Sequence, residues 1–238
     1  VLVSQEHIKA SGEKGVRGVL FNSGQANACT GEQGRENCLL SLDMVSAALR
    51  DAGENVSADE LLPASTGVIG AQMPMDKWAA AVPALVSSLG RVDIEGLARA
   101  MMTTDAYPKM SGRELSLSGG TVLLAGVAKG AGMICPNMAT MLSLVMCDAA
   151  VEPSVWRDMF RRAADATFNR VSVDGDTSTN DSLFGLANGA SGVTVAESEL
   201  PLLESALTEV LGELAYMLVK DGEGATKVMH IHVTGAAC

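Results

Sequence analysis

The stretch from Lys129 to Leu142, KGAGMICPNMATML, is the part of the sequence that most constrains the fold. It begins with a glycine loop, Gly130-Ala131-Gly132, and it ends in a continuous apolar run, Met141–Cys147. A short apolar run bounded by turn residues is typical of a buried strand. The sequence therefore predicts that the hydroxyl of Thr140 lies where a loop enters a buried strand, directly after the small residue Ala139.

The composition favours a full core built from aliphatic side chains. Of the 238 residues 47% are apolar but only 3% are aromatic, so Ala, Val, Leu and the 13 Met must fill the interior. A chain of this length buries roughly 70–75% of its unfolded surface, which is enough for one large domain or two small ones. The net charge of −11 argues against nucleic acid as a partner, because phosphate binding requires clustered Lys and Arg. A small charged metabolite remains compatible with this charge.

The cysteines and the absence of long apolar runs favour a cytoplasmic protein with reduced thiols and no membrane partner. No apolar run approaches the roughly 18 residues that a transmembrane helix needs, and the first residues do not resemble a signal peptide. Because the sequence begins without Met, we interpret it as the middle of a longer chain. The cysteines are odd in number and include no C-x-x-C pair. They are Cys29, Cys38, Cys135, Cys147 and Cys238.

The spacing of apolar residues predicts helices and strands mixed along the chain, which is typical of an α+β layered domain. Pro83 is expected to kink or divide the second of the predicted helices. The predicted helices are Arg35–Ala52, Lys77–Leu89, Ile94–Met102, Pro153–Phe168 and Glu197–Val219. The predicted strands are Val16–Asn22, a hairpin of Glu114–Ser118 and Thr121–Val127, Met141–Cys147, Arg170–Val173 and Val228–Val233.

Three polar loops are candidates for ligand contact, although each also fits an ordinary turn. Ser23–Gly31 and the turn Ser65-Thr66-Gly67 can aim backbone N–H groups at an anion or a substrate. Asp174–Asp181 is rich in oxygen ligands but departs from the EF-hand pattern, since its glycine falls second and no Glu closes it. A side-chain-capped loop is favoured there over a metal site. His230 and His232 share one face of a predicted strand without a third ligand, so no metal is expected there either.

The sequence favours a nucleophile that does not depend on histidine. It contains no Walker motif, no complete G-x-G-x-x-G and no G-x-S-x-G, and its 3 His make a Ser–His–Asp triad hard to assign. A threonine can act alone once its α-amino group is free, because an α-amine with a pKa of about 7.7–8 serves as a general base. Freeing it requires the hydroxyl to attack the preceding carbonyl. Ala139 and Thr140 have the residue types that this self-cleavage needs.

Seven motifs, spread from residue 22 to residue 226, occur in the order found in one protein family. They are Asn22–Gly31 (NSGQANACTG), Pro63–Gly70 (PASTGVIG), Met102–Asp105 (MTTD), Lys129–Ile134 (KGAGMI), Pro136–Leu142 (PNMATML), Ser172–Asp181 (SVDGDTSTND) and Asp221–Thr226 (DGEGAT). In these motifs the chain resembles the glutamate N-acetyltransferase, or ornithine acetyltransferase, family of arginine biosynthesis.

The resemblance implies a fold, a reaction and a processing event. The fold is a layered α/β/β/α sandwich of the N-terminal-nucleophile-like ornithine acetyltransferase type. The reaction moves an acetyl group from N2-acetylornithine to L-glutamate through an acetyl-threonine intermediate, without a cofactor. Family members cleave themselves before the threonine of the P-N-M-A-T-M-L motif, which here separates Ala139 from Thr140. The products are an α part, 1–139, and a β part, 140–238, which together form one main catalytic domain and assemble as a heterotetramer.

The resemblance also implies roles for individual residues. Thr140 is the nucleophile, and Thr66 and Gly67 form the oxyanion hole for the acetyl carbonyl. We infer from charge that the lysine suits the α-carboxylate of acetylornithine and that the glutamate suits its distal ammonium. The substrate-binding positions are Thr103 (or the adjacent Thr104), Lys129, Thr140 and Glu223.

The chain is shorter than members of the family, and this leaves alternative functions open. Family members continue before the N-S-G-x-A-N motif and after the D-G-E-G-A-T motif, so the sequence is interpreted as a fragment. One alternative is an N-terminal-nucleophile aminopeptidase or amidase of related fold, with water as the acceptor. Another is an inactive fragment that folds without a complete site. The resemblance leaves open whether acetyl-CoA is a second acetyl donor.

Overall fold

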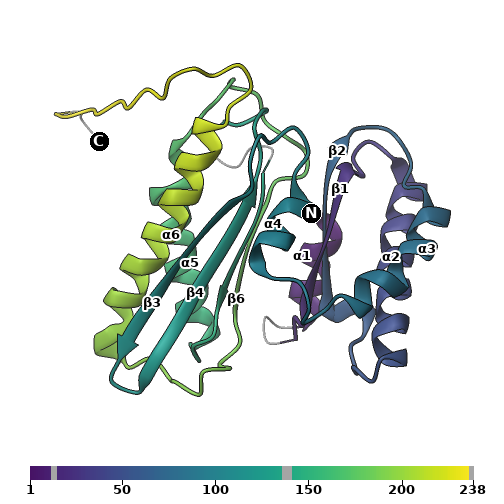
Figure 1. The fold of residues 1–238 in the computed structure, drawn as a ribbon, viewed down its shortest axis with the longest axis horizontal. Coiled ribbons are helices and arrows are strands. Elements are labelled where there is room, and N and C mark those ends of the chain that lie inside the picture. Colours follow the sequence, from purple (N-terminus) through teal and green to yellow (C-terminus); the bar gives the residue numbers. More distant parts are fainter. Residues whose placement is uncertain (12–14, 136–140, 236–238) are drawn as a thin grey trace.

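The computed structural model describes residues 1–11, 15–135 and 141–235, which form two β-sheets and the helices packed against them (Figure 1). Short 3-10 turns lie at Ala58–Glu60, Phe168–Arg170 and Glu197–Glu199. The α-helices are α1 (Leu2–Ser11), α2 (Gly31–Asp51), α3 (Met75–Ser87), α4 (Ile94–Met101), α5 (Pro153–Ala166) and α6 (Leu200–Lys220). The strands are β1 (Gly18–Gln25), β2 (Leu61–Val68), β3 (Lys109–Leu117), β4 (Gly120–Lys129), β5 (Leu142–Cys147) and β6 (Ser182–Ala187).

The first sheet is the parallel pair β1–β2, in register from Gly18 opposite Leu61 to Gln25 opposite Val68. Parallel neighbours need a crossover connection, and α2 provides it. The apolar stripe of α2, with Leu42 fully buried, packs in one cluster with α3 and one face of this sheet. The register sets the polar ends of β1 and β2 side by side.

The second sheet has the order β3-β4-β5-β6 and is antiparallel except for the parallel pair β5–β6. α5 joins β5 to β6, and α5 and α6 cover the outer face of the sheet (Figure 1). α6 packs tightly on β4 at Gly126, where a Cβ atom would lie 2.9 Å from Leu214 and Val210. Leu207 and Leu211, on the same side of α6, are also fully buried.

The inner faces of the two sheets share a third cluster of buried side chains. It joins Leu62 and Ala64 of β2 to Val127 of β4 and Phe184 of β6. Phe184 also meets Phe21 of β1 edge-on, with ring centroids 6.1 Å apart. The layers therefore run helices, sheet, sheet, helices, which confirms the predicted α/β/β/α arrangement.

Several expected elements differ in the structure. Ser65-Thr66-Gly67 is not a turn, because these residues continue β2 in parallel pairing with β1. Arg170–Val173 is not a strand: a 3-10 turn ends at Arg170, and the following residues have no regular secondary structure. The helix α1 and the strands β2 and β6 were not predicted. The hairpin and the long helices were confirmed to within a few residues.

Two further differences have clear physical reasons. Val228–Val233 has no regular structure, since no described strand lies beside it, and Met229 and Ile231 are 81% and 79% exposed. Pro83 does not divide its helix: α3 runs through it on an exposed face, where water can bind the carbonyl that the proline leaves unpaired.

Candidate active site

Lys129 lies at the end of a row of side chains that faces from the second sheet toward the first. Side chains alternate along a strand, so Lys129 continues the row of Val127 on β4, and Thr66 continues the row of Ala64 on β2. The two meet between the sheets: Lys129 Nζ donates to Thr66 Oγ1 at 3.1 Å and to Thr103 Oγ1 at 2.8 Å. The predicted lysine, oxyanion-hole threonine and substrate threonine are thus brought together.

Lys129 is nearly inaccessible, with 2% of its surface exposed. Burial lowers its pKa, and the positive charge of Lys109 acts in the same direction. Carboxylates of Asp105, Asp181 and Glu223 oppose this change. Within the part of the chain that the structure describes, the Lys129 ammonium donates to hydroxyl groups alone. Among the described residues, Lys129 is therefore buried without a carboxylate in direct contact.

Gly67 follows Thr66 at the end of β2, opposite Gly24 of β1. Its φ of +128° is disfavoured for residues with a side chain, and a Cβ atom there would lie 2.3 Å from the Gly24 carbonyl carbon. Only glycine fits at this position. The close approach of the two backbones fixes the position of the predicted oxyanion-hole pair near the end of β2.

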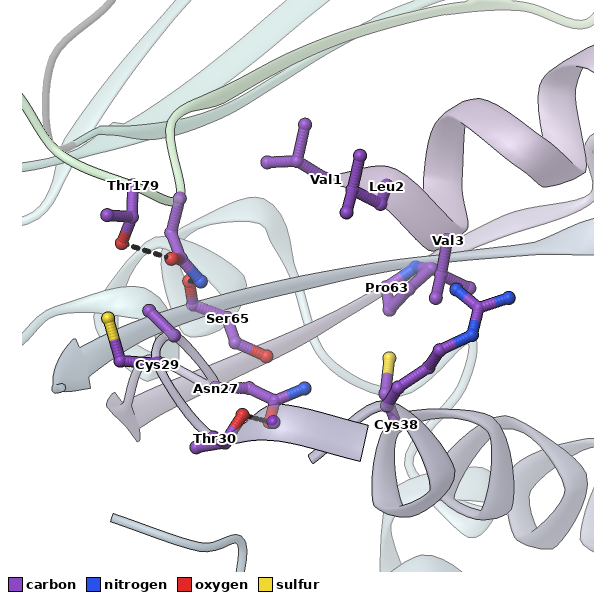
Figure 2. A pocket seen from close by; sticks show the side chains of 14 residues that line it. Val1, Leu2, Val3, Asn27, Cys29, Thr30, Cys38, Pro63, Ser65 and Thr179 are labelled. Atoms are coloured by element: carbon purple, nitrogen blue, oxygen red, sulfur yellow. Dashed lines mark hydrogen bonds between the residues drawn. The ribbon is translucent and has the colours of Figure 1, made fainter. Parts of the chain in front are cut away.

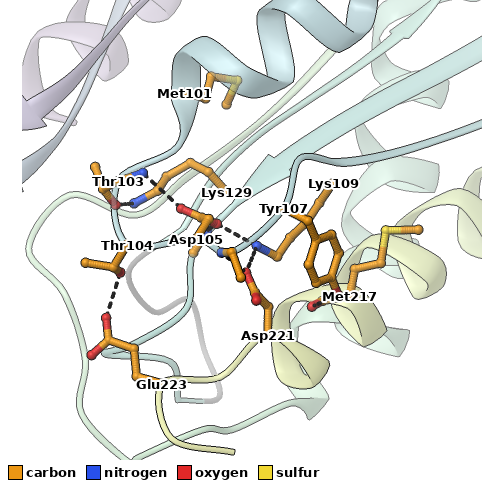
Figure 3. A network of polar contacts seen from close by, with 12 residues as sticks. Met101, Thr103, Thr104, Asp105, Tyr107, Lys109, Lys129, Met217, Asp221 and Glu223 are labelled. Carbon is orange, nitrogen blue, oxygen red and sulfur yellow. Dashed lines mark hydrogen bonds and ion pairs between the residues drawn. The ribbon is translucent and has the colours of Figure 1, made fainter.

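The adjacent threonines Thr103 and Thr104 contact different partners (Figure 3). Thr103 accepts from Lys129, whereas the Thr104 hydroxyl donates to Glu223 Oε1 at 2.6 Å. The backbone N–H of Glu223 donates to Ala131 O at 2.6 Å, which places the glutamate against the glycine loop. The two threonines thus connect the basic and the acidic residue predicted to bind substrate.

A buried ionic group lies behind these residues, and sequence reasoning missed it. Lys109 is fully buried and donates to Asp105 Oδ1 and to Asp221 Oδ2, each at 2.6 Å. Its Nζ also lies 5.1 Å from the centre of the Tyr107 ring. Neither contact has a local sequence signal: Asp105 and Lys109 are four residues apart but not in a helix, where that spacing brings side chains together, and Asp221 is 112 residues from Lys109.

Asp181 binds the residue that follows Thr140. Its Oδ1 accepts the Met141 N–H at 2.8 Å, while its buried Oδ2 has no hydrogen-bond partner among the described residues. Burial raises the pKa of Asp181 to about 7, against the opposing effects of the Met141 and Ser178 N–H groups and of the Lys129 charge. A carboxyl group that titrates near neutral pH therefore lies next to the start of β5.

The polar loop Asp174–Asp181 braces the site through hydrogen bonds. Asp174 accepts the N–H groups of Met133 at 2.6 Å and Ile134 at 3.0 Å. The Asn180 amide donates to Ser65 O at 3.0 Å and also to Ala26 O. Among the described residues no cluster of three or more His, Cys, Asp or Glu could hold a metal. The loop ties β1, β2 and the glycine-rich stretch to one another.

Ala139 and Thr140 lie outside the described residues, so the predicted cleavage and the nucleophile role stay predictions. The structure does describe the residues on either side. Lys129 pairs with Leu142 across β4 and β5, and Met141 O accepts the Ser182 N–H at 3.0 Å. The chain after residue 140 thus enters the sheet directly beside Lys129.

A pocket of about 340 Å³ lies on the other face of β2 (Figure 2). Ser65 lines it, and because neighbouring side chains on a strand point to opposite faces, the strand separates the pocket from Thr66 and Lys129. Cys29, Thr30 and Asn180 also line it. None of the residues predicted to form the oxyanion hole or to bind substrate within the described chain lines this pocket, whereas each of the three candidate polar loops contributes to it. His230 and His232 are exposed and do not line this pocket.

No helix in the described ranges has the length and apolar character needed to cross a membrane.

Comparison with known proteins agrees with the resemblance seen in the motifs. The arginine biosynthesis bifunctional protein ArgJ of Nitratidesulfovibrio vulgaris is 60% identical over 236 residues, which cover 99% of this chain and 58% of that protein. The protein of the same name from Thermosynechococcus vestitus is 48% identical over 222 residues, covering 92% and 52%. The chain thus spans little more than half the length of these curated relatives.

Two solved structures are also similar. The crystal structure of arginine biosynthesis bifunctional protein ArgJ from Bacillus halodurans has a TM-score of 0.48 and 30% identity, covering 59% of this chain and 69% of that one. Ornithine acetyltransferase from Mycobacterium tuberculosis, complexed with ornithine, has a TM-score of 0.46 and 35% identity, covering 57% and 68%. A family model described as the ArgJ family matches residues 1–238. The chain therefore belongs to the ArgJ family.

Proposed function

We propose that this chain carries the acetyl-transfer site of a glutamate N-acetyltransferase, which moves the acetyl group of N2-acetylornithine to L-glutamate through an acetyl ester of Thr140. The single observation that best supports the proposal is the meeting of Lys129 with Thr66 and Thr103. These residues come from three separate sequence motifs, and the chain belongs to the ArgJ family. We place the enzyme in the cytoplasm, where its cysteines stay reduced.

The hydrogen bonds at Thr66 suit an oxyanion hole. Because Thr66 Oγ1 accepts a hydrogen bond from Lys129, its own proton is free to point elsewhere. A neighbouring ammonium also polarises the hydroxyl and strengthens it as a donor. When the Thr140 hydroxyl attacks the acetyl carbonyl, the Thr66 hydroxyl and the Gly67 N–H stabilise the developing negative charge. One such donor typically contributes about 3–4 kcal/mol to the transition state.

The charged residues match the ends of the donor substrate. Acetylornithine carries an α-carboxylate and a distal ammonium. An ammonium group has three donors, and Lys129 uses two of them on Thr66 and Thr103, so one remains for a carboxylate oxygen. Glu223 is exposed and already accepts from Thr104, which suits it to the distal ammonium. Pairing both charges discriminates against neutral analogues.

The proposed processing cuts between Ala139 and Thr140 and frees the Thr140 α-amine as a general base. The cut falls between β4 and β5, which are antiparallel neighbours with residues 124–129 opposite 142–147. The α part, 1–139, and the β part, 140–238, therefore stay joined in one sheet, and we propose that two such pairs form a heterotetramer. The transfer itself needs no cofactor, and acetyl-CoA is proposed solely as an additional acetyl donor.

Mass spectrometry and product analysis test this function. The purified protein should contain two chains that meet at Ala139/Thr140, and N-acetylglutamate should form from N2-acetylornithine and glutamate. Thr140→Ala should abolish both cleavage and transfer, whereas Thr121→Ala, an exposed threonine on β4, should change neither. An active single chain would contradict the proposal. Acetate release that does not depend on glutamate would identify an amidase instead.

A further inference from the structure

Asp105 lies at the centre of the polar network shown in Figure 3, although no motif assigns it a role. Its Oδ1 accepts the Gly130 N–H at 2.7 Å and Lys109 Nζ at 2.6 Å, and its Oδ2 accepts the Thr103 N–H at 3.0 Å. Gly130 directly follows Lys129, and Thr103 is the residue that Lys129 contacts. One buried carboxylate thus holds the backbone on both sides of the Lys129–Thr103 hydrogen bond.

Lys109 extends this arrangement to the segment that carries Glu223. It bridges Asp105 to Asp221, and Asp221 Oδ2 also accepts the Ala106 N–H at 3.0 Å. Asp221 lies two residues before Glu223, whose N–H is held by Ala131. Three separate chain segments therefore converge on one ionic group whose two carboxylates and one ammonium have a net charge of −1.

The donors around Asp105 require a charged carboxylate. All three partners present N–H groups, so an amide in its place would turn its own NH₂ toward one of them. Burial disfavours ionisation of Asp105, but hydrogen bonds from Lys109, Gly130 and Thr103 outweigh it and lower its pKa. Asp105 is therefore negatively charged at neutral pH, and this charge acts on the nearby Lys129 ammonium.

We propose that Asp105 is a positioning residue for the transfer site: it fixes Thr103 and Gly130, and so holds the Lys129 side chain at Thr66. The inference rests on the proposed function for its catalytic consequence, but its effect on Lys129 is independent of turnover. Four charged groups act on Lys129: Asp105, Asp181 and Glu223 favour the ammonium, and Lys109 disfavours it. Asp221 also pairs with Lys109, but among the described residues it has no hydrogen bond to Thr103 or Gly130.

This difference gives a matched pair of variants. Asp105→Asn and Asp221→Asn each remove one carboxylate from Lys109, so both should lower thermal stability. The full chain is labelled with ¹³C at the lysine ε carbons, Lys129 is assigned through Lys129→Arg, and its titration is followed by NMR. Asp105→Asn should lower the titration midpoint of Lys129 by about one pH unit. Asp221→Asn should move that midpoint less, because among the described residues Asp221 does not hold the backbone beside Lys129.

Kinetics give a second readout. Asp105→Asn should lower kcat/KM for acetyl transfer by about 100-fold, since small misplacements of binding groups have effects of that size. It should also move the alkaline limb of the pH profile downward with the Lys129 titration. Asp105→Glu restores the charge but not the arm length, so it should recover the titration while kcat/KM stays reduced. This split separates the charge of Asp105 from its position.

The two possible failures are distinguishable. If the wild-type protein has no transferase activity, the proposed function fails, but the NMR titration still tests Asp105. If Asp105→Asn and Asp221→Asn change the Lys129 titration equally, Asp105 is a structural ion-pair partner and the inference is overturned. Should Asp105→Asn fail to fold, Asp105→Asn/Lys109→Met removes the opposing charges together. Because Lys109 itself lowers the Lys129 pKa, this double variant is compared with Lys109→Met alone, and equal Lys129 midpoints in the two would also overturn the inference.

Discussion

Lys109 and Lys129 are both almost completely buried, yet their surroundings are opposite. Lys109 is enclosed by two carboxylates at 2.6 Å, while Lys129 donates, among the described residues, to two threonine hydroxyls. Burying a cation is costly unless it is paired. Lys109 satisfies this rule and joins separate chain segments, so its role is to stabilise the fold. Lys129 satisfies it incompletely, which is typical of a residue whose partner is a ligand.

Lys109→Met should cause the largest change, and it should be a change in stability. Removing one member of a buried ion pair leaves the other charge uncompensated, at a typical cost of about 3–5 kcal/mol. Asp105 and Asp221 would both lose their shared partner. Urea unfolding of the variant beside the wild type measures the loss. A free energy of unfolding within about 1 kcal/mol of the wild type would show that the ionic group does not hold the three segments together.

Lys129→Met should show the opposite pattern. Because the two threonine hydroxyls can be partly rehydrated and a desolvated charge is removed, stability should change by no more than about 1 kcal/mol. Acetyl transfer should fall by roughly 100-fold or more, as expected when a substrate carboxylate loses its charged partner. Steady-state kinetics with acetylornithine and unfolding curves of the same sample give both values. A stable variant with full activity would remove Lys129 from the proposed site.

Some features of the molecule could be predicted from the sequence, whereas others depend on how distant segments meet in the fold. The periodic aliphatic positions of α2, α5 and α6 and the β3–β4 hairpin were predictable, because local pattern determines them. The motifs also indicated the segments that meet at Lys129. The bridge from Lys109 to Asp221 was not predictable, since it spans 112 residues of sequence and depends on how α6 ends beside β3. The prediction of a strand at Val228–Val233 was wrong for a related reason. Alternating apolar residues indicate a strand, but a strand requires a neighbouring strand to pair with.

Asp181 extends the comparison of Lys109 and Lys129 to a buried acidic group, and its substitution is expected to have the smallest effect. Its folded-state pKa of about 7 lies above the ordinary Asp value of 3.8, so the folded protein binds this proton more tightly than the unfolded chain does. Both states are protonated below about pH 4. As the pH rises from about 4 to 7 the unfolded state ionises first, and folding stability is lost across that window.

Asp181→Asn removes this penalty while its amide oxygen can still accept the Met141 N–H. The variant should therefore gain about 1–3 kcal/mol of stability relative to the wild type at pH 8 and gain nothing at pH 4. Unfolding curves at the two pH values measure the difference. A gain that is the same at both would show that the proton on Asp181 is not its cause.

The most direct test of the whole account is to trap the acetyl group on the protein. Incubation with N2-acetylornithine in the absence of glutamate should leave the 140–238 chain heavier by one acetyl group, attached as a hydroxylamine-sensitive ester on Thr140. Addition of glutamate should remove it and release N-acetylglutamate. Transfer to glutamate with no acetylated Thr140 at any time, or with the acetyl group on another residue, would contradict the account.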